Sequence, residues 1–328
     1  MAQFQSDRSK NMGNILITGA NGMVGRALIR LLAGGSTDIK AVVYPGEPLR
    51  LPDSPCLEII EGDINDIDWA PLLDGVDAVV HLAARVHVFD KREAGWDQFY
   101  QTNVAATKEL CLQAVKAEIK KFIFVSTVGV YGDYPQLDES GELLIAPQND
   151  YARSKLMAEA EVVNTLGGQV PYLIFRPVMM YGPGDRGNMG RMIRAIGHRR
   201  FVIPGSGSNK KSALYVDDFA RIIAASLADD NLCDETFIVS NKDAISMREM
   251  CDTISRKVAG GWNVPSIPPR LLGIAGRLGD YVKILPVDSA TVKKLTIDSD
   301  YSKYSVIQKR LDINEETTLE QALKKMGY

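Results

Sequence analysis

A tyrosine and a lysine four residues apart carry the most evident chemistry in this sequence of 328 residues. They stand in the segment Tyr151-Ala152-Arg153-Ser154-Lys155, and on a helix this spacing places both side chains on one face. A free phenol titrates near about 10, so it is a poor acid or base at neutral pH. A nearby ammonium stabilises phenolate, and we therefore expect Lys155 to lower the pKa of Tyr151 and prepare it for proton transfer at a hydroxyl or carbonyl.

Two hydroxyl side chains end the apolar run that precedes this pair along the chain. The run Phe122–Ser126 predicts a buried strand, and Thr127 follows it directly. A hydroxyl there can donate to a carbonyl or alkoxide beside Tyr151, with Thr127 as first candidate and Ser126 as a supporting contact. Such a hydroxyl can instead cap its own backbone, and this alternative stays open for each of them.

A glycine-rich loop near the N-terminus indicates a dinucleotide site. Gly19, Gly22 and Gly25 are spaced GxxGxxG between a predicted strand and a predicted helix. Such a loop lets the backbone approach a pyrophosphate, and the following helix offers free N–H groups to the anion. The alternative is a tight turn that binds no ligand, but the predicted strand before the loop and the helix after it favour a dinucleotide site.

The residues that would distinguish NAD from NADP follow the second predicted strand. An acid at the end of the second strand would bind a ribose 2′-OH and favour NAD, but the first acid here is Glu47. Arg26 and Arg50 can meet a 2′-phosphate or be solvated surface charges, so we expect NAD and leave NADP open. Asp63 can accept from the adenine amino group, cap a helix over Ile67–Leu73, or do both.

The elements around these residues alternate between strands and helices. The predicted strands are nearly continuous apolar runs, as parallel strands covered on both faces are. They lie at Asn14–Thr18, Lys40–Tyr44, Leu57–Glu61, Ala78–His81, Phe122–Ser126 and Tyr172–Arg176, with helices at Gly22–Ala33, Trp96–Ala117 and Tyr151–Leu166 between them. This alternation predicts the α/β class and a Rossmann-type doubly wound parallel sheet.

The pattern changes after residue 176. Glycine and proline gather in Tyr181–Asp185 and Pro204–Ser208, while Val216–Leu227 predicts a helix and Glu235–Ser240 a further strand. We expect a smaller C-terminal substrate-binding lobe built from segments inserted into and following the nucleotide domain. The predicted boundaries are 13–178 plus 214–240 for the Rossmann domain and 179–213 plus 241–328 for the lobe.

Composition narrows the partners and the compartment. The net charge of -3 gives no broad electrostatic case for nucleic acid. No secretory or membrane-spanning run is evident, and the amphipathic Pro268–Leu285 is expected to pack on the second lobe. Four separated cysteines without a CxxC pair indicate a reducing cytoplasm, and we expect His81 and His198 to be structural rather than metal ligands.

Taken in order, these pieces resemble the extended short-chain dehydrogenase/reductases, specifically the NAD-dependent epimerase/dehydratase group acting on nucleotide sugars. The matching segments are TGANGMVG (18–25), GDI (62–64), HLAA (81–84), NVAAT (103–107), FVSTVGVYG (124–132), YARSK (151–155), RPVMMYGPG (176–184) and YVDDFA (215–220). The resemblance implies Thr127, Tyr151 and Lys155 as catalytic residues. It also implies a homodimer in which the helices at 96–117 and 151–166 form a four-helix bundle.

The resemblance further implies residues for the cofactor and the substrate. Those expected around NAD are Gly19, Asn21, Gly22, Met23, Val24, Gly25, Asp63, Ile64, Leu82, Ala83, Ala84, Asn103, Ser126, Tyr151, Lys155 and Pro177. Those expected at the sugar nucleotide are Arg85, Thr127, Tyr151, Met179, Asn188, Arg191 and Lys211, and His87 is a further candidate. Arginine and lysine there would neutralise a diphosphate, and a solvated basic helix face is the alternative.

The residues after the threonine discriminate within the family. In sugar 4,6-dehydratases the matching threonine is followed by Asp-Glu, whereas Val128 and Gly129 stand here and cannot move protons. We therefore reject dehydration and expect a UDP-sugar 4-epimerase. A 4-keto-sugar reductase or dehydrogenase, an enzyme of small or steroid-like alcohols, and a noncatalytic NADPH sensor are the alternatives. The missing strand-two acid and Met179, where many members place a substrate-contacting asparagine, count against the epimerase.

Overall fold

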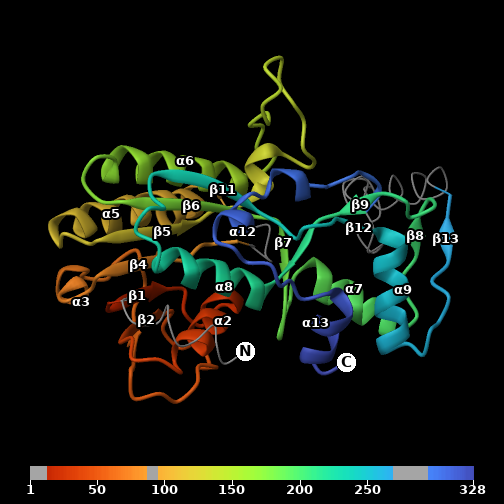
Figure 1. The fold of residues 1–328 in the computed structure, drawn as a ribbon, viewed down its shortest axis with the longest axis horizontal. Helices are drawn as coiled ribbons and strands as arrows, with labels where there is room; N and C mark the ends of the chain where they lie inside the picture. Colours follow the sequence, from red (N-terminus) through yellow and green to blue (C-terminus); the bar gives the residue numbers. More distant parts are fainter. Residues whose placement is uncertain (1–12, 87–94, 269–294) are drawn as a thin grey trace.

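The computed structural model describes residues 13–86, 95–268 and 295–328. Its centre is a seven-stranded parallel sheet in the order β11-β6-β5-β4-β1-β2-β3 (Figure 1). The strands are β1 (Ile15–Thr18), β2 (Ile39–Val43), β3 (Leu57–Glu61), β4 (Ala78–His81), β5 (Lys121–Val125), β6 (Tyr172–Pro177) and β11 (Glu235–Val239). The predicted Rossmann-type sheet is confirmed. The strand order reverses between β1 and β4, and in such sheets ligands bind at the carboxyl ends of the strands beside this point.

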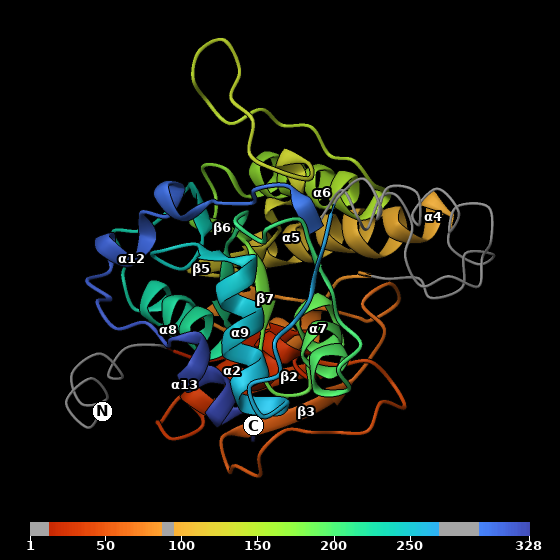
Figure 2. The same cartoon turned by 90° about the vertical axis from the view of Figure 1, so that its right-hand side faces the viewer.

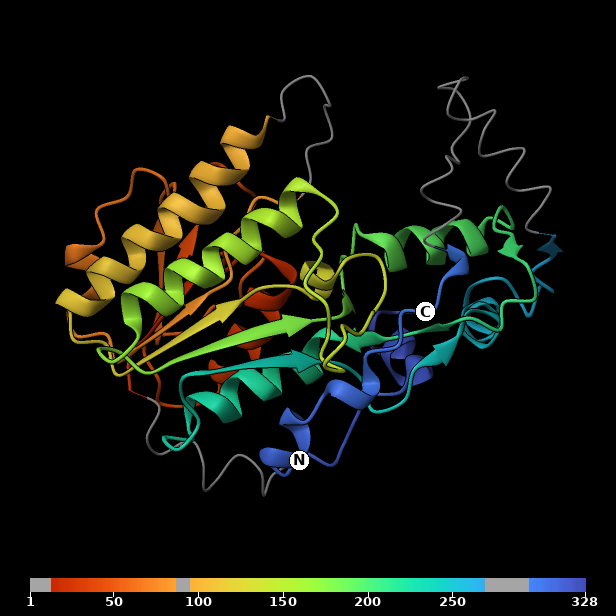
Figure 3. The same ribbon diagram turned by 90° about the horizontal axis from the view of Figure 1, so that it is seen from above.

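Alternate side chains of the inner strands enter two separate cores. Ile15 and Ile17 of β1 pack with α2 (Met23–Leu32) and α8 (Val216–Leu227) on one face. Leu16 points to the other face, which is covered by α3 (Ala70–Leu73), α5 (Ala106–Lys116) and α6 (Asp150–Leu166). Figure 3 shows α5 and α6 above the sheet and α8 below it. The continuous apolar runs follow from this double burial.

The helix predicted over residues 96–117 is interrupted by a π-helical stretch. It begins as α4 (Trp96–Phe99), continues as the π-helix η2 (Tyr100–Ala105) and ends as α5. A π-helical turn widens the backbone locally, and such turns are frequent at functional sites. The widened turn contains Asn103, which is buried.

The second lobe joins short strands to three helices. β7 (Met179–Tyr181) pairs with β10 (Ala213–Tyr215), β8 (Ile203–Pro204) with β13 (Ser266–Ile267), and β9 (Lys210–Lys211) with β12 (Ile245–Ser246). The helices are α7 (Asn188–Gly197), α9 (Met247–Val258) and α13 (Leu319–Lys325), and Figure 2 looks onto them with α9 between the other two. Their buried faces form a third core.

The C-terminal segment contributes side chains to the cores of both parts of the molecule. The 3-10 helix η4 (Ser302–Tyr304) and α12 (Ile307–Arg310) lead back toward the sheet. Tyr301, Ile307 and Leu311 are buried in the core that contains α2 and α8. Part of the segment assigned to the substrate lobe therefore packs on the nucleotide domain.

Candidate functional site

The glycine loop has the shape that a pyrophosphate requires. Gly19 has φ +65°, and a Cβ there would stand 2.7 Å from the backbone nitrogen of Ala83. A Cβ on Gly25 would overlap the carbonyl oxygen of Ala20. Helix α2 begins after Gly22 with no side-chain cap and no acid in its first turn, so its positive end is available to an anion. These observations fit a dinucleotide at this loop.

Asn21 holds the neighbouring loop with its side chain. Its Nδ2 donates to Oε2 of Glu47 at 3.1 Å and to the carbonyl of Pro48 at 3.1 Å. Its Oδ1 accepts from the backbone nitrogen of Arg50 at 3.1 Å. The side chain predicted to contact the cofactor thus fixes the segment after β2.

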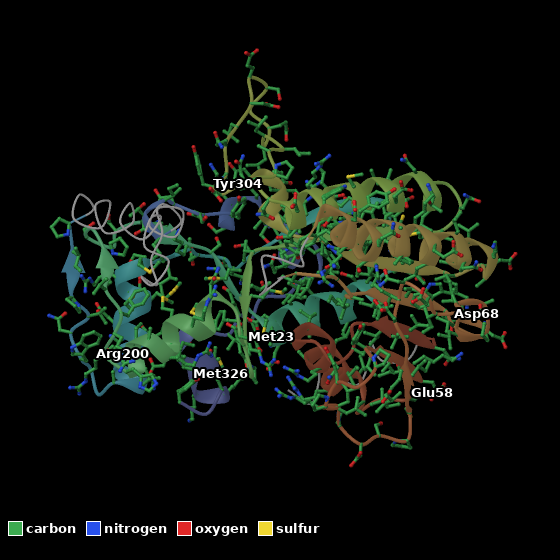
Figure 4. The ribbon with its side chains drawn as sticks, turned by 180° about the vertical axis from the view of Figure 1, so that it is seen from behind. Met23, Glu58, Asp68, Arg200, Tyr304 and Met326 are labelled. Carbon is green, nitrogen blue, oxygen red and sulfur yellow. The ribbon has the colours of Figure 1, made fainter. Side chains whose placement is uncertain are left out.

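Arg26 joins the phosphate loop to the second lobe. Nη1 donates to the carbonyl of Asn21 at 2.8 Å, and Nη2 donates to the carbonyl of Pro183 at 3.3 Å. Burial, and next the charges of Arg50, Arg30 and Arg186, lower the pKa of Arg26. Met23 also lies at this junction, because its sulfur is 3.5 Å from where a Cβ on Gly182 would stand (Figure 4).

Asp63 does not cap the helix expected after it. Its Oδ1 accepts from the backbone nitrogen of Asn65 at 3.0 Å and from Nδ2 of that residue at 2.6 Å. The helix α3 begins only at Ala70, whose nitrogen donates to Asp68 at 3.2 Å. The expected cap is therefore wrong, since Asp63 forms a local turn. Its neighbour Ile64 packs partly against the core beneath α5.

Thr127 caps its own backbone and still keeps a proton to donate. It is the N-cap of the 3-10 helix η3 (Val128–Tyr131), and its Oγ1 accepts from the nitrogen of Gly129 at 3.0 Å. An accepting hydroxyl retains its O–H, so the two roles proposed for Thr127 are compatible. The hydroxyl of Ser126 is buried and donates to Glu159.

Tyr151 lies in the first turn of α6, which Asn149 caps by accepting from the nitrogen of Ala152 at 2.9 Å. Nζ of Lys155 is buried 3.9 Å from the ring centroid of Phe124. Burial raises the pKa of Tyr151 to about 12. Burial also lowers the pKa of Lys155 to about 7, and the charge of Glu159 opposes this. The pKa of Tyr151 is thus raised where we expected it to be lowered, because desolvation of the phenol outweighs the effect expected of Lys155.

Asn103 ties the segment after β4 to the catalytic helix. Its Oδ1 accepts from the nitrogen of Arg85 at 2.7 Å, and its Nδ2 donates to the carbonyl of Arg85 at 3.0 Å. Nδ2 also donates to Oγ of Ser154 at 2.8 Å, and that hydroxyl donates to the carbonyl of Tyr151 at 2.8 Å. The amide thus orders Leu82, Ala83 and Ala84, which lead from the sheet to Arg85.

The start of α7 is held by an internal carboxylate. Asp185 accepts from the nitrogen of Gly187 at 2.5 Å and from that of Gly190 at 2.8 Å. Asn188 is exposed, and its Oδ1 accepts from Nη2 of Arg191, also exposed, at 2.5 Å. These two predicted substrate residues thus contact each other. Other exposed arginines lie further along the lobe, and Arg200 is well separated from Met23 in Figure 4.

The remaining predicted substrate residues differ in their surroundings. Arg85 is half-buried, and its Nε has no hydrogen-bond acceptor among the described residues. Met179 lies in β7 and packs against the core of the second lobe. Lys211 is buried and donates to the carbonyl of Ile297 at 2.6 Å. Burial lowers its pKa to about 8, against the charge of Asp298. Pro177, expected at the cofactor, is buried at the end of β6, while the candidate at position 87 lies outside the described residues.

A buried ion pair behind the catalytic helix was not predicted. Nε of Arg176 donates to Oε1 of Glu159 at 3.0 Å, and Nη1 donates to the hydroxyl of Tyr131 at 2.5 Å. Ser126 donates to the same carboxylate, so strands β5 and β6 are joined to α6. The signal was present in the sequence, because Arg176 ends an apolar strand and Glu159 follows Lys155 by one helical turn.

Comparison with known proteins gives a consistent set of matches. A model described as the NAD dependent epimerase/dehydratase family matches residues 15–239. The UDP-glucose 4-epimerase of Vibrio cholerae is 32% identical over 247 residues, which cover 72% of this chain and 73% of that protein. The N-acetyl-alpha-D-glucosaminyl-diphospho-ditrans,octacis-undecaprenol 4-epimerase of Escherichia coli O157:H7 is 29% identical over 279 residues, 80% of this chain and 77% of that protein.

Solved structures show the same fold. The UDP-glucuronic acid 4-epimerase of Bacillus cereus, in complex with UDP-glucuronic acid and NAD, superposes with a TM-score of 0.74. It is 23% identical, and the match covers 95% of this chain and 97% of that chain. At this identity the likeness concerns the architecture.

Proposed function

The chain belongs to the NAD-dependent epimerase/dehydratase family, and on that premise we propose that it is a UDP-sugar 4-epimerase. One observation carries the proposal. Thr127 and Tyr151 lie on adjacent elements at the carboxyl end of β5, with the apolar Val128 and Gly129 where a dehydratase would need an acid and a base. This arrangement suits hydride chemistry at one sugar carbon without loss of water. The relatives named for 4-epimerisation support it.

NAD is the cofactor of this family, and when bound it would supply a hydride acceptor for the substrate carbon. The free N–H groups at the start of α2 would hold its pyrophosphate, and Gly19 would allow the close approach. The loop that Asn21 holds would line the adenosine. The segment from Leu82 to Arg85, ordered by Asn103, would line the side toward the nicotinamide.

The catalytic residues would divide the proton chemistry between them. Tyr151 takes the proton of the C4 hydroxyl in one half of the reaction and returns it in the other. With a pKa of about 12 the phenol is protonated at neutral pH, which suits the half in which it donates. In the accepting half the ammonium of Lys155 stabilises the phenolate, and Thr127 donates its free O–H to the C4 oxygen.

A second candidate is a 4-keto-sugar reductase or dehydrogenase of the same family. The observation that favours it is the end of β2, where no acid stands to hold the adenosine ribose. Family epimerases generally retain NAD tightly, whereas a net reductase or dehydrogenase must release it after each turnover. Intact Thr127, Tyr151 and Lys155 argue against a noncatalytic sensor, and the basic second lobe argues against a steroid-like substrate.

The substrate contacts and the quaternary state are also proposals. Arg191 and Lys211 are proposed for the diphosphate, with Arg85, Met179 and Asn188 nearer the sugar. A homodimer through α5 and α6 is supported by apolar side chains on these helices, since Leu112 is 40% exposed and Val163 is 42% exposed. Replacing both by glutamate should convert a dimer to a monomer in sedimentation experiments.

A cytoplasmic location is proposed because all four cysteines are free thiols. Among the described residues, no helix has both the length and the apolar character that crossing a bilayer demands.

The experiment that tests the function uses a panel of UDP-hexoses. The purified protein is incubated with UDP-glucose, UDP-galactose, UDP-N-acetylglucosamine and UDP-glucuronic acid, and C4 configuration is followed by NMR. Nicotinamide absorbance is recorded in parallel. Epimer formation without net absorbance change supports the proposal, and stoichiometric change in reduced nicotinamide contradicts it in favour of the reductase or dehydrogenase. Tyr151→Phe should be inactive while still binding NAD.

A further inference from the structure

His81 ends β4 between the two halves of the proposed site and takes no part in the chemistry described above. Its side chain is buried, with 1% exposed. Its ring stacks on Phe124 with centroids 5.6 Å apart and an interplanar angle of 28°. Both ring nitrogens have hydroxyl partners, at 2.7 Å on Thr18 and 2.9 Å on Thr107.

The partners determine which nitrogen carries the proton. Oγ1 of Thr107 donates its only proton to the carbonyl of Asn103 at 2.8 Å, so it must accept from Nε2 of His81. Oγ1 of Thr18 accepts from the backbone nitrogens of Leu82 at 3.2 Å and Ala83 at 3.1 Å. Its own proton is therefore directed to Nδ1 at 2.7 Å. Only the neutral Nε2–H tautomer satisfies every donor and acceptor in this chain of hydrogen bonds through Thr18, His81 and Thr107.

The surroundings also disfavour a charged ring. Burial, and next the positive charge of Lys155, lower the pKa of His81 to about 3. Lys155 lies over the ring of Phe124, on which His81 stacks. A proton on Nδ1 would leave Thr18 without an acceptor in this chain, at a cost of about 1–3 kcal/mol for a buried unsatisfied group.

The two ends of this chain reach different parts of the site. Thr18 directly precedes Gly19, and the nitrogen of Ala83 that it binds is the atom closest to a Cβ built on Gly19. At the other end, the carbonyl that Thr107 binds belongs to Asn103, whose side chain reaches the catalytic helix through Ser154. One hydrogen-bond chain therefore runs from the phosphate loop to the helix of Tyr151.

We propose that His81, held as the neutral Nε2–H tautomer, is a positioning residue that couples the phosphate loop to the catalytic helix. The neutral imidazole fixes the donor-to-acceptor direction of this hydrogen-bond chain, since each threonine hydroxyl has one proton and one available acceptor for it. Removing a link frees Asn103 and Ala83 to shift independently, which weakens nucleotide binding and misorients Tyr151 together. The inference rests on the proposed function only where it assigns proton transfer to Tyr151, and it does not depend on which sugar is bound.

Thr107 offers a matched pair of variants for the test. Thr107→Ser keeps the hydroxyl, whereas Thr107→Val keeps the volume of this fully buried side chain and removes both hydrogen bonds. The chain contains three histidines, so the signals of His81 in ¹⁵N NMR can be assigned by their loss in His81→Gln. We expect the wild type to show a neutral ring protonated on Nε2, and Thr107→Ser to keep that pattern. We expect Thr107→Val to show a mixture of tautomers.

Binding and turnover complete the test. Thr107→Val should weaken NAD binding and lower kcat about tenfold each, the loss expected for one buried hydrogen bond. Thr107→Ser should stay within about twofold of the wild type in both. A wild-type ring protonated on Nδ1 or doubly protonated would overturn the proposal, as would Thr107→Val with a lower Tm but unchanged NAD affinity and kcat. If no UDP-sugar is turned over, the proposed function fails, while the NMR and NAD-binding results still decide this inference.

Discussion

The buried Lys155 should destabilise the folded protein in the absence of nucleotide, and Lys155→Met should relieve this. Lys155 is 1% exposed, and the pKa of its ammonium falls from 10.5 to about 7 because burial penalises the charge. Methionine has a similar length and no charge to desolvate. Arg176 remains to pair with Glu159, so the substitution leaves no buried carboxylate alone.

The size of the effect follows from the pKa. A pKa lower in the folded than in the unfolded protein means that the unfolded chain binds the proton more tightly, and each pH unit between the two is worth about 1.4 kcal/mol. Full separation from 10.5 to about 7 gives about 5 kcal/mol. The attraction of the Phe124 face for the ammonium acts on the protonated form alone, so it is part of this same difference, and about 5 kcal/mol is expected in favour of Lys155→Met at low pH.

The pH dependence gives the sharper assay. The destabilisation is complete below pH 7, declines as the folded protein releases the proton, and is absent above about 10.5. We expect urea unfolding of nucleotide-free protein to show Lys155→Met more stable by about 5 kcal/mol at low pH, with the difference shrinking as pH rises. Lys116→Met, on the exposed face of α5, is the control and should track the wild type. A Lys155→Met protein that is less stable, or whose advantage is independent of pH, would refute the reasoning.

Three further substitutions test the geometry of the site. Gly19→Ala places a Cβ against Ala83 at φ +65°, and we expect a loss of about 1–2 kcal/mol in unfolding free energy with NAD binding abolished in calorimetry; retained affinity would show that the loop adjusts. Asn103→Asp keeps the acceptor for the nitrogen of Arg85 but loses the bonds donated to the carbonyl of Arg85 and to Ser154, so kcat should fall about tenfold at nearly unchanged KM. An unchanged kcat would show that these donated bonds are not needed to orient the catalytic helix. Asp185→Ala removes the carboxylate that accepts from the nitrogens of Gly187 and Gly190 at the start of α7. It should cost about 1 kcal/mol by thermal unfolding, raise KM for the sugar nucleotide and spare NAD affinity; an unaltered KM would separate α7 from substrate binding.

The architecture was predictable because the inner strands of the sheet are buried on both faces. The apolar runs around Ile15–Thr18 and Lys121–Val125 have no other environment in which they are stable. The glycine loop and the Tyr151–Lys155 spacing were also readable, since they depend on local backbone geometry. The π-helical turn at Tyr100–Ala105 was not, because apolar spacing does not distinguish i→i+5 from i→i+4 hydrogen bonds over so few residues.

The electrostatics of the site depended on contacts that no local pattern contains. Lys155 and Tyr151 lie one turn apart as predicted, but Phe124 and the surrounding core determine that both groups favour their neutral forms. Asn21 was predicted at the cofactor, and its actual partners on the loop after β2 lie more than twenty residues away along the chain. Side-chain partners at such separations follow from the tertiary packing, which the sequence periodicities do not specify.

The central claim is that hydride leaves and returns to C4 of a UDP-sugar with Tyr151 handling the proton. The most direct measurement uses UDP-glucose carrying deuterium at C4, with products analysed by NMR and mass spectrometry in ordinary water. We expect UDP-galactose that retains deuterium at C4, and no product from Tyr151→Phe. Product that has exchanged its C4 deuterium for solvent hydrogen, or undiminished turnover by Tyr151→Phe, would contradict it.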